Sequence, residues 1–283
     1  LDRSSAASDV YKRQPYSRDL RVADSTIGAR FPNPQLVQDF GNHSMPETAD
    51  AVAAELGLTR EACDAYALQS QQRFAAAQAA GVFAQEIVPI DVPQGRKAAP
   101  LVFAVDEHPR ADTTLASLQK LRPLFDGGVT TAGNASGIND GAAAVLLGSL
   151  AAGERHGQQP LARVLSAAVA GVEPRLMGLG PVTAIERALR RAGLALSQVD
   201  LIEINEAFAA QVLGCLQRLG LSATDARVNP NGGAIAVGHP LGASGARLAL
   251  SAAHELRRRN GRYAVVSLCI GVGQGIAVVL ERA

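Results

Sequence analysis

Aliphatic runs alternate with amphipathic helical patterns after residue 160, and this alternation restricts the fold more than any other feature of the sequence. The aliphatic runs are short, rich in Val, Ile, Leu and Ala, and end at glycine or polar residues, as buried strands do. The expected strands are residues 161–171, 200–207, 226–233, 262–271 and 273–282, and the expected helices are residues 180–193, 208–220 and 244–261. The order βαβαβαββ predicts an α/β fold with a mixed, mostly parallel sheet and helices on both faces.

Two helices and a short strand are expected in the first half, where the alternation is less regular. Pro46 opens a helical pattern that closes at Gly57, which matches the preference for proline at helix starts and glycine at helix ends. Thr59 is a suitable N-cap for a second, longer helix. Residues 86–93 have the pattern of a strand with an edge proline. Residues 128–149 are expected to pass from a Gly/Asn/Ser loop into a helix of small residues.

The net charge and the cysteines limit the partners, the metal sites and the cellular compartment that are expected for this chain. Lys and Arg total 27 against 26 for Asp and Glu, so the formal net charge is +1 and neither nucleic acid nor an anionic membrane is an expected partner. No apolar run reaches the ~18 residues of a membrane-spanning helix. Cys63, Cys215 and Cys269 lack metal-ligand spacing, so no metal is expected. Their odd number, without a signal peptide, indicates a reducing compartment, the cytoplasm.

Three polar side chains capable of chemistry stand where expected strands end. Asn205 follows an aliphatic strand, His239 lies between glycine clusters in "NPNGGAIAVGHPLGASGAR", and Cys269 ends a strand before a glycine turn. Open α/β sheets bind their ligands at the edge where the carboxyl ends of the strands lie. Imidazole can deprotonate a thiol or stabilise an oxyanion, and a thiol can relay a proton. The three groups therefore favour acyl-transfer chemistry, provided that they converge on one site.

Each of these residues also has a structural interpretation. A histidine in a glycine-rich turn often makes only a backbone hydrogen bond, and a cysteine at a strand end is usually a small buried apolar residue. Asn205 could be the cap of the following helix. "GASGA" and "GVGQG" suggest nucleotide loops, but neither is a G-x-G-x-x-G sequence after the first strand, so a dinucleotide-dependent oxidoreductase is disfavoured.

The segments around these residues resemble the C-terminal half of thiolases, CoA-dependent enzymes that make or cleave 3-oxoacyl-CoA. The similar segments are "NEAFAAQ", "VNPNGGAIAVGHPLGASGAR" and "CIGVGQGIAVVLER". Upstream, the segments that resemble the CoA-binding loop domain of the family are "SQQRFAAAQAAGVFAQEIVP", "DEHPR", "LRPLF" and "TAGNASGINDGAA". The resemblance runs from Asp24 to Ala283 and implies a thiolase-like fold with an additional α/β loop domain.

The resemblance implies four parts in the chain. They are a non-native or disordered tail at residues 1–19, the loop domain at 20–138, a remnant of the N-terminal core domain at 139–159, and the C-terminal core domain at 160–283. Thiolases carry the acyl group on a cysteine in a Cys-Gly-Ser-Gly-like motif of the first core domain, and this sequence has no such motif. Cys63 stands in "REACDAY", on a predicted helix, and does not replace it. We interpret the missing part of the first core domain as an N-terminal truncation.

Within the family, "DSTIGARFPNP", "HSMPETADAVA" and "DARVNPNGG" are most similar to thiolases that act on 3-oxoadipyl-CoA in the β-ketoadipate pathway of aromatic degradation. Such an enzyme would cleave 3-oxoadipyl-CoA with CoA to succinyl-CoA and acetyl-CoA, with CoA as a substrate and no bound cofactor. General acetoacetyl-CoA thiolases have His-Met-Gly where this chain has Ser44-Met45-Pro46. The alternatives are an acetoacetyl-CoA or fatty-acid thiolase and a non-catalytic CoA- or lipid-binding protein of this fold.

The same resemblance implies a role for each site residue. His239 would activate the nucleophilic thiol and help to hold the thioester oxyanion, and Asn205 would orient the water that completes this oxyanion hole. Cys269 would exchange a proton with the α-carbon of acetyl-CoA, and the backbone amide of Gly271 would contribute to a second oxyanion site. The candidates for CoA binding are Ser136, Arg110 and Ser117.

The resemblance also implies a homotetramer or homodimer for the full-length protein, with two core domains packed against each other. With most of one core domain missing, this chain is expected to expose a large apolar face. We therefore expect it to be poorly soluble and inactive in thiolysis.

Overall fold

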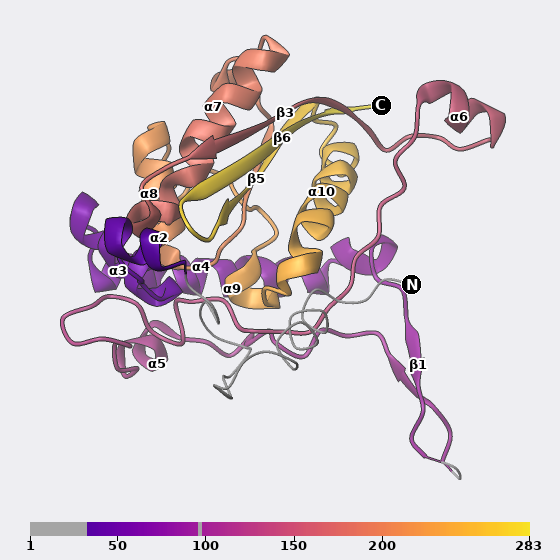
Figure 1. The fold of residues 1–283 in the computed structure, drawn as a ribbon. Helices are drawn as coiled ribbons and strands as arrows, with labels where there is room; N and C mark the ends of the chain where they lie inside the picture. Colours follow the sequence, from indigo (N-terminus) through magenta and orange to yellow (C-terminus); the bar gives the residue numbers. More distant parts are fainter. Residues whose placement is uncertain (1–32, 96–97) are drawn as a thin grey trace, which may run out of the picture.

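The structure is a computed structural model that describes residues 33–95 and 98–283 (Figure 1). The expected tail at residues 1–19 and nearly all of the "DSTIGARFPNP" segment lie outside the described residues. The elements of the second half are β3 (Ala162–Gly171), η2 (Pro174–Leu179), α7 (Gly180–Ala192), η3 (Leu196–Gln198), β4 (Leu201–Ile204), α8 (Ala209–Leu219), α9 (Ala234–Val237), α10 (Leu241–Arg258), β5 (Tyr263–Ile270) and β6 (Gln274–Arg282).

The strands of the second half form one sheet with the order β3-β6-β5-β4. β4 and β5 are parallel, whereas β6 runs antiparallel to both β5 and β3. The expected mixed sheet is confirmed, but the expectation that it is mostly parallel is wrong. β5 and β6 are joined by a turn at residues 271–273, where Val272 and Gly273 have φ values of 66° and 82°. Such a short turn can join only antiparallel neighbours, because a parallel pair needs a crossover of about a dozen residues.

The expected strand at residues 226–233 does not form. Val228 makes a single β-bridge to Ile202 of β4, and the chain then turns at Asn229, whose φ is 41°. The Asn229 side chain accepts a hydrogen bond from Ile204 N at 2.9 Å and donates one to Ile204 O at 2.8 Å. This side chain takes the place of a continuing strand at the edge of β4, so the strand pairing stops there.

Helices cover both faces of the sheet, as expected (Figure 1). On one face, Ile185, Ala188 and Leu189 of α7 pack against one set of alternate strand residues: Ile202, Ile204, Val265, Ala277 and Val279. On the other face, Leu248, Ala252 and Leu256 of α10 pack against the neighbouring strand residues of opposite orientation: Leu201, Ala264, Val266 and Leu280. The alternation follows from the pleat, which directs successive side chains to opposite faces.

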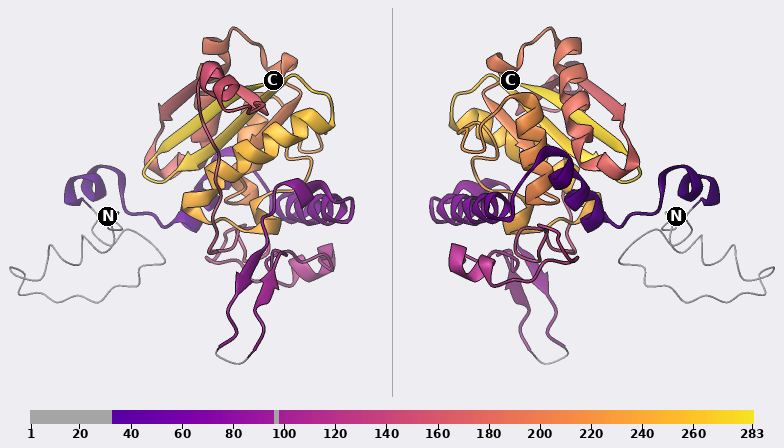
Figure 2. Two further views of the ribbon diagram at one scale, coloured as in Figure 1. Left: turned by 90° about the vertical axis from the view of Figure 1, so that its right-hand side faces the viewer. Right: turned by 90° about the vertical axis from the view of Figure 1, so that its left-hand side faces the viewer.

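The first half is mainly helical and packs at one end of the sheet, with the β1–β2 hairpin projecting farthest from it (Figure 2). Its elements are α2 (Pro34–Phe40), α3 (Met45–Leu56), α4 (Arg60–Ala79), η1 (Val82–Gln85), β1 (Ile90–Val92), β2 (Leu101–Phe103) and α5 (Leu115–Gln119), followed by α6 (Leu150–Arg155). The expected helix signals are confirmed. Gly57 ends α3 in the left-handed conformation, and Thr59 Oγ1 accepts a hydrogen bond from Ala62 N at 3.2 Å at the start of α4.

The helix expected to follow the Gly/Asn/Ser loop is displaced: residues 139–149 are not helical, and α6 begins only at Leu150. Leu146 and Leu147 are 90% and 76% exposed, so neither side chain is covered by the described residues. A short helix is not stable without a packed face, which explains why the small-residue pattern does not become one here. None of the helices in the described part of the chain is long and apolar enough to cross a membrane.

Candidate active site

Asn205 and His239 lie in hydrogen-bond contact. Asn205 follows β4 directly, is buried, and places its Nδ2 atom 3.2 Å from Nε2 of His239. Its backbone N–H donates to Ser267 O of β5 at 2.9 Å, so the pairing of the two parallel strands positions the amide. The interpretation of Asn205 as a helix cap is wrong, because Phe208 is the N-cap of α8. The fold therefore brings the amide and the imidazole together.

A neighbouring loop and the first turn of α10 hold His239. Its backbone N–H donates to Gly137 O at 3.2 Å and to Asn139 Oδ1 at 3.3 Å. Gly238 has a φ of 98°, and a Cβ atom there would collide with the Asn139 side chain. Position 238 therefore requires glycine for both its conformation and its lack of a side chain. Ser244 Oγ lies 2.6 Å from Nδ1 of the His239 ring.

Cys269 lies at the same edge of the sheet as Asn205. It stands near the end of β5, the parallel neighbour of β4, and packs against Ala49, Ala207 and Phe208. The residue as a whole is partly exposed, whereas its thiol group is surrounded by protein. Adjacent parallel strands thus deliver the amide and the thiol to one edge.

Gly271 follows β5 in the turn to β6. A Cβ atom at this position would stand 4.0 Å from the Sδ and Cε atoms of Met45, the first residue of α3. The start of α3 therefore lies against the turn that follows Cys269.

Burial controls the protonation of the site. Burial, and secondarily the charge of Arg247, lowers the pKa of His239, so the ring is neutral at pH 7 and can accept a proton. Burial raises the pKa of Cys269 to about 12, so the side chain is a thiol. Asn205 Oδ1 is buried without a partner among the described residues, and such an oxygen can hold a water or a substrate donor. The edge therefore presents a proton acceptor, a proton donor and a polar anchor.

Glu206 is a buried carboxylate that connects α4 to the loop carrying His239. Oε1 and Oε2 each accept two hydrogen bonds, from Tyr66 Oη (3.0 Å), Asn229 Nδ2 (3.1 Å), Ser70 Oγ (2.6 Å) and Ile235 N (3.1 Å). Ile235 lies in α9, which leads directly to His239. Because the carboxylate is fully paired, it can hold these segments together without a cation.

A cavity of about 450 Å³ opens beside this edge. It is lined by Gln71, His108, Arg110, Asp112, Thr113, Ser117, Leu118, Leu121, Ala132, Gly133, Ala135 and Ile235. Of the CoA-binding candidates, Arg110 and Ser117 line the cavity, whereas Ser136 does not, although its neighbour Ala135 does. Ser136 N donates to Ala207 O at 2.9 Å. The segment that lines the cavity at Ala135 is therefore hydrogen-bonded, through Ser136, to the chain that follows Asn205.

Hydrogen bonds within the protein limit what these lining residues can offer a ligand. Ser117 Oγ donates to Thr114 O at 2.7 Å and accepts from Thr114 N at 3.1 Å, so it completes the cap of α5. The Arg110 guanidinium makes only a long contact of 3.4 Å, to Glu107 O, among the described residues. His108 also lines the cavity, and burial and Arg110 lower its pKa. Arg110 is thus the lining residue with the most donors free for an anionic ligand.

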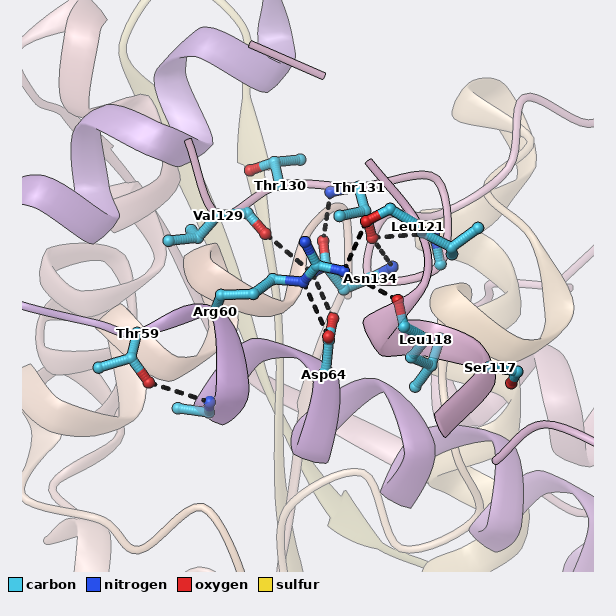
Figure 3. A network of polar contacts seen from close by, with 12 residues as sticks. Thr59, Arg60, Asp64, Ser117, Leu118, Leu121, Val129, Thr130, Thr131 and Asn134 are labelled. Atoms are coloured by element: carbon cyan, nitrogen blue, oxygen red, sulfur yellow. Dashed lines mark hydrogen bonds and ion pairs between the residues drawn. The ribbon is translucent and has the colours of Figure 1, made fainter. Parts of the chain in front are cut away.

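An ion-pair network holds the cavity wall against α4 (Figure 3). Arg60 Nε donates to Asp64 Oδ2 at 2.7 Å, and Arg60 Nη2 donates to Leu118 O and Leu121 O at 2.8 and 2.9 Å. Asn134 Nδ2 donates to Asp64 Oδ1 at 2.9 Å. Arg60 thus holds the segment of Leu118 and Leu121 while Asp64 holds Asn134, and this ion pair preorganises the cavity wall.

Three residues of the site were not expected from the sequence: His108, Asn139 and Ser244. Ser244 had a weak local signal, because it stands in the first turn of a helix five positions after His239. Asn139 stands in the segment "TAGNASGINDGAA", but its contact with His239 had no local signal, since 100 positions separate the two residues.

Comparison with known proteins assigns both halves of the chain to one family. A family model described as "Thiolase, N-terminal domain" matches residues 8–151, and one described as "Thiolase, C-terminal domain" matches residues 158–282.

Individual relatives agree with these matches. The chain is 57% identical over 268 residues to the 3-oxoadipyl-CoA/3-oxo-5,6-dehydrosuberyl-CoA thiolase of Escherichia coli (strain K12), covering 94% of this chain and 67% of that protein. It is 54% identical over 268 residues to the beta-ketoadipyl-CoA thiolase of Acinetobacter baylyi, with the same coverage of 94% and 67%. The solved structure of human mitochondrial 3-ketoacyl-CoA thiolase in complex with CoA matches with a TM-score of 0.81 and 50% identity, over 86% of this chain and 60% of that one. The chain therefore spans between 60% and 67% of the length of these relatives and has their α/β fold.

Proposed function

Because this chain belongs to the thiolase family, we propose that it contributes the proton-transfer groups and the CoA-binding cavity to the thiolytic cleavage of a 3-oxoacyl-CoA. In that reaction the bond between C2 and C3 breaks, acetyl-CoA leaves, and CoA takes up the shortened acyl group. The observation that carries the proposal is the 3.2 Å contact between the Asn205 amide and the His239 imidazole, at the edge that also holds Cys269.

Each group has one task in this proposal. Nε2 of His239 takes the proton of the nucleophilic thiol. The resulting imidazolium, with a water oriented by Asn205, stabilises the oxyanion of the thioester. Cys269 gives its proton to the α-carbon of the leaving acetyl-CoA, and the backbone N–H of Gly271 stabilises the enolate oxygen in that step.

None of the three cysteines of this sequence stands in a Cys-Gly-Ser-Gly-like motif that would supply the acyl-carrying nucleophile. We therefore expect the purified chain alone not to cleave 3-oxoacyl-CoA. Cleavage above background by this chain, and its loss in a Cys269→Ser variant, would contradict that expectation.

CoA binding is the property to test on the chain itself. We propose that Arg110 pairs with the phosphates at the nucleotide end of CoA and that Ser136 contacts the pantetheine; Ser117 contributes less because its hydroxyl caps α5. Calorimetric titration should show binding of CoA and not of NAD, and Arg110→Ala should weaken CoA binding about tenfold, as expected for a charge-assisted hydrogen bond. Arg155→Ala, an exposed arginine of α6, is the matched control. Equal binding of CoA and NAD would exclude the proposal.

We propose 3-oxoadipyl-CoA as the substrate. The E. coli and A. baylyi relatives carry that specificity in their names. The "HSMPETADAVA" segment, which differs from general acetoacetyl-CoA thiolases, lies at the site, because Met45 neighbours Gly271 and Ala49 packs near Cys269. Competition titrations should show tighter binding of 3-oxoadipyl-CoA than of acetoacetyl-CoA. Equal affinities would contradict this specificity and leave the family function intact.

A further inference from the structure

Ser244 is buried in the first turn of α10 and contacts the ring of His239. It is 0% exposed, and its Oγ atom lies 2.6 Å from Nδ1 of His239 and 3.0 Å from Pro240 O. A hydroxyl has one hydrogen to donate and can also accept. Ser244 can therefore donate its hydrogen either to His239 Nδ1 or to Pro240 O. The other hydrogen-bond partner of the ring determines which of the two it is.

Asn205 determines which ring nitrogen carries the hydrogen. Its Nδ2 atom lies 3.2 Å from Nε2 of His239, and an amide nitrogen can only donate, so Nε2 accepts. In a neutral imidazole the other nitrogen then carries the hydrogen, and Nδ1–H donates to Ser244 Oγ. The hydroxyl hydrogen is thereby directed to Pro240 O. The hydrogen bonds therefore run in one direction, from the Asn205 amide to the His239 ring, from the ring to the Ser244 hydroxyl, and from the hydroxyl to Pro240 O.

We propose that Ser244 is a positioning residue that holds His239 in the Nδ1–H tautomer and thereby keeps Nε2 unprotonated, so that Nε2 can act as the base. This inference rests on the proposed thiolase chemistry of His239. When the nucleophilic thiol is activated, its S–H bond breaks, the sulfur keeps the electron pair, and Nε2 binds the proton with its lone pair. The bond from Nδ1–H to Ser244 persists in both states, so the ring neither rotates nor exchanges its other proton.

A hydroxyl suits this position better than a carboxylate would. A carboxylate beside Nδ1–H would stabilise the imidazolium and raise the pKa of the ring. The neutral oxygen of Ser244 orients the ring without adding charge, in agreement with the lowered pKa of His239, which has burial and Arg247 as its causes. Because Ser244 donates its own hydrogen to Pro240 O, its oxygen accepts from Nδ1–H and supports the tautomer that Asn205 favours, while the ring remains neutral.

Nuclear magnetic resonance of the full chain with isotope-labelled histidine tests the proposal, because the shifts of the two ring nitrogens distinguish the tautomers. A His239→Gln variant identifies the signals of this ring. We expect the Nδ1–H tautomer to dominate in the parent chain. Ser244→Ala should change the tautomer ratio toward Nε2–H by about two- to tenfold, the factor that corresponds to one net hydrogen bond.

Ser251→Ala is the matched control, because Ser251 lies on the same helix and donates to Glu86 Oε2 at 2.5 Å, away from the ring. It should leave the ratio unchanged, and Ser244→Thr, which keeps the hydroxyl, should retain the parent ratio even if Ser244→Ala fails to fold. An Nε2–H tautomer in the parent, or equal ratios in the parent and Ser244→Ala, would overturn the proposal. CoA titration of the same samples reports on the proposed function separately. A chain that shows the tautomer change but binds no CoA would refute the function and not the role of Ser244.

Discussion

Replacing Glu206 by glutamine tests whether the buried carboxylate stabilises the loop that carries His239. Glutamine has nearly the same size, but its amide nitrogen donates where a carboxylate oxygen accepted. If the nitrogen takes the Oε2 position, it faces the backbone N–H of Ile235, which cannot accept. If it takes the Oε1 position, it faces Nδ2 of Asn229, whose Oδ1 atom already accepts from Ile204 N at 2.9 Å. Neither orientation satisfies every donor.

The cost of this change follows from the four hydrogen bonds to Glu206. One buried N–H is left without an acceptor, at about 1–3 kcal/mol, and the remaining bonds become neutral and weaker. The removal of a buried charge offsets part of this loss. We expect the free energy of unfolding to fall by about 2–4 kcal/mol, which is a large share of the total of about 5–15 kcal/mol for a typical protein.

Urea denaturation followed by circular dichroism measures the difference between the parent and the variant. Glu173→Gln is the matched control, because the Glu173 side chain is 52% exposed and pairs with Arg175 at 3.0 Å. Loss of an exposed pair costs less than about 1 kcal/mol. If Glu206→Gln and the control differ by less than about 0.5 kcal/mol, the reasoning about the buried carboxylate is refuted.

Native-state thiol labelling should proceed first at Cys269, because the other two cysteines are fully buried, and its rate should rise about tenfold per pH unit, since burial raises its pKa to about 12. Equal labelling of all three cysteines in mass spectra would contradict this. Stability should fall as the pH rises from 4.5 to about 8, because burial raises the pKa of Glu203 over that range and the folded state keeps a proton that the unfolded state has lost. Melting curves of Glu203→Gln should lack this slope, and an unchanged slope would exclude Glu203 as its cause. Arg60→Met should cost about 3 kcal/mol in urea denaturation, because the buried carboxylate of Asp64 loses its cation. A loss below about 1 kcal/mol would show that this pair is not needed to hold the cavity wall.

Most elements of the second half were predictable from the sequence, because each carries its own signals. α7 and α8 end at Gly193 and Gly220, which both take the left-handed conformation that glycine adopts without strain. The aliphatic runs of β3, β5 and β6 are long enough to indicate strands whatever their partners are. Local backbone preference and burial pattern therefore determined these elements.

The errors concern features that depend on a partner. The sequence pattern around Val228 is that of a strand, but the side chain of Asn229 bonds to β4 and ends the pairing. The helix expected before Leu150 lacked a surface to pack on. The antiparallel direction of β6, by contrast, follows from the short turn after β5 and could have been inferred from the sequence. A local pattern shows which side chains can be buried, but not which surface buries them.

The sequence by itself determined that Asn205, His239 and Cys269 stand in strand-end or glycine-rich segments, where polar side chains reach a ligand. The tertiary structure decided that the amide meets the imidazole and that Ser244 meets its other nitrogen. It also decided that the carboxylate of Glu206 joins α4 to the loop of His239. The physical reason is range: helix and strand patterns arise from neighbours a few residues apart, whereas a hydrogen bond between distant segments forms only after packing of the sheet and helices has placed its donor and acceptor within about 3 Å of each other.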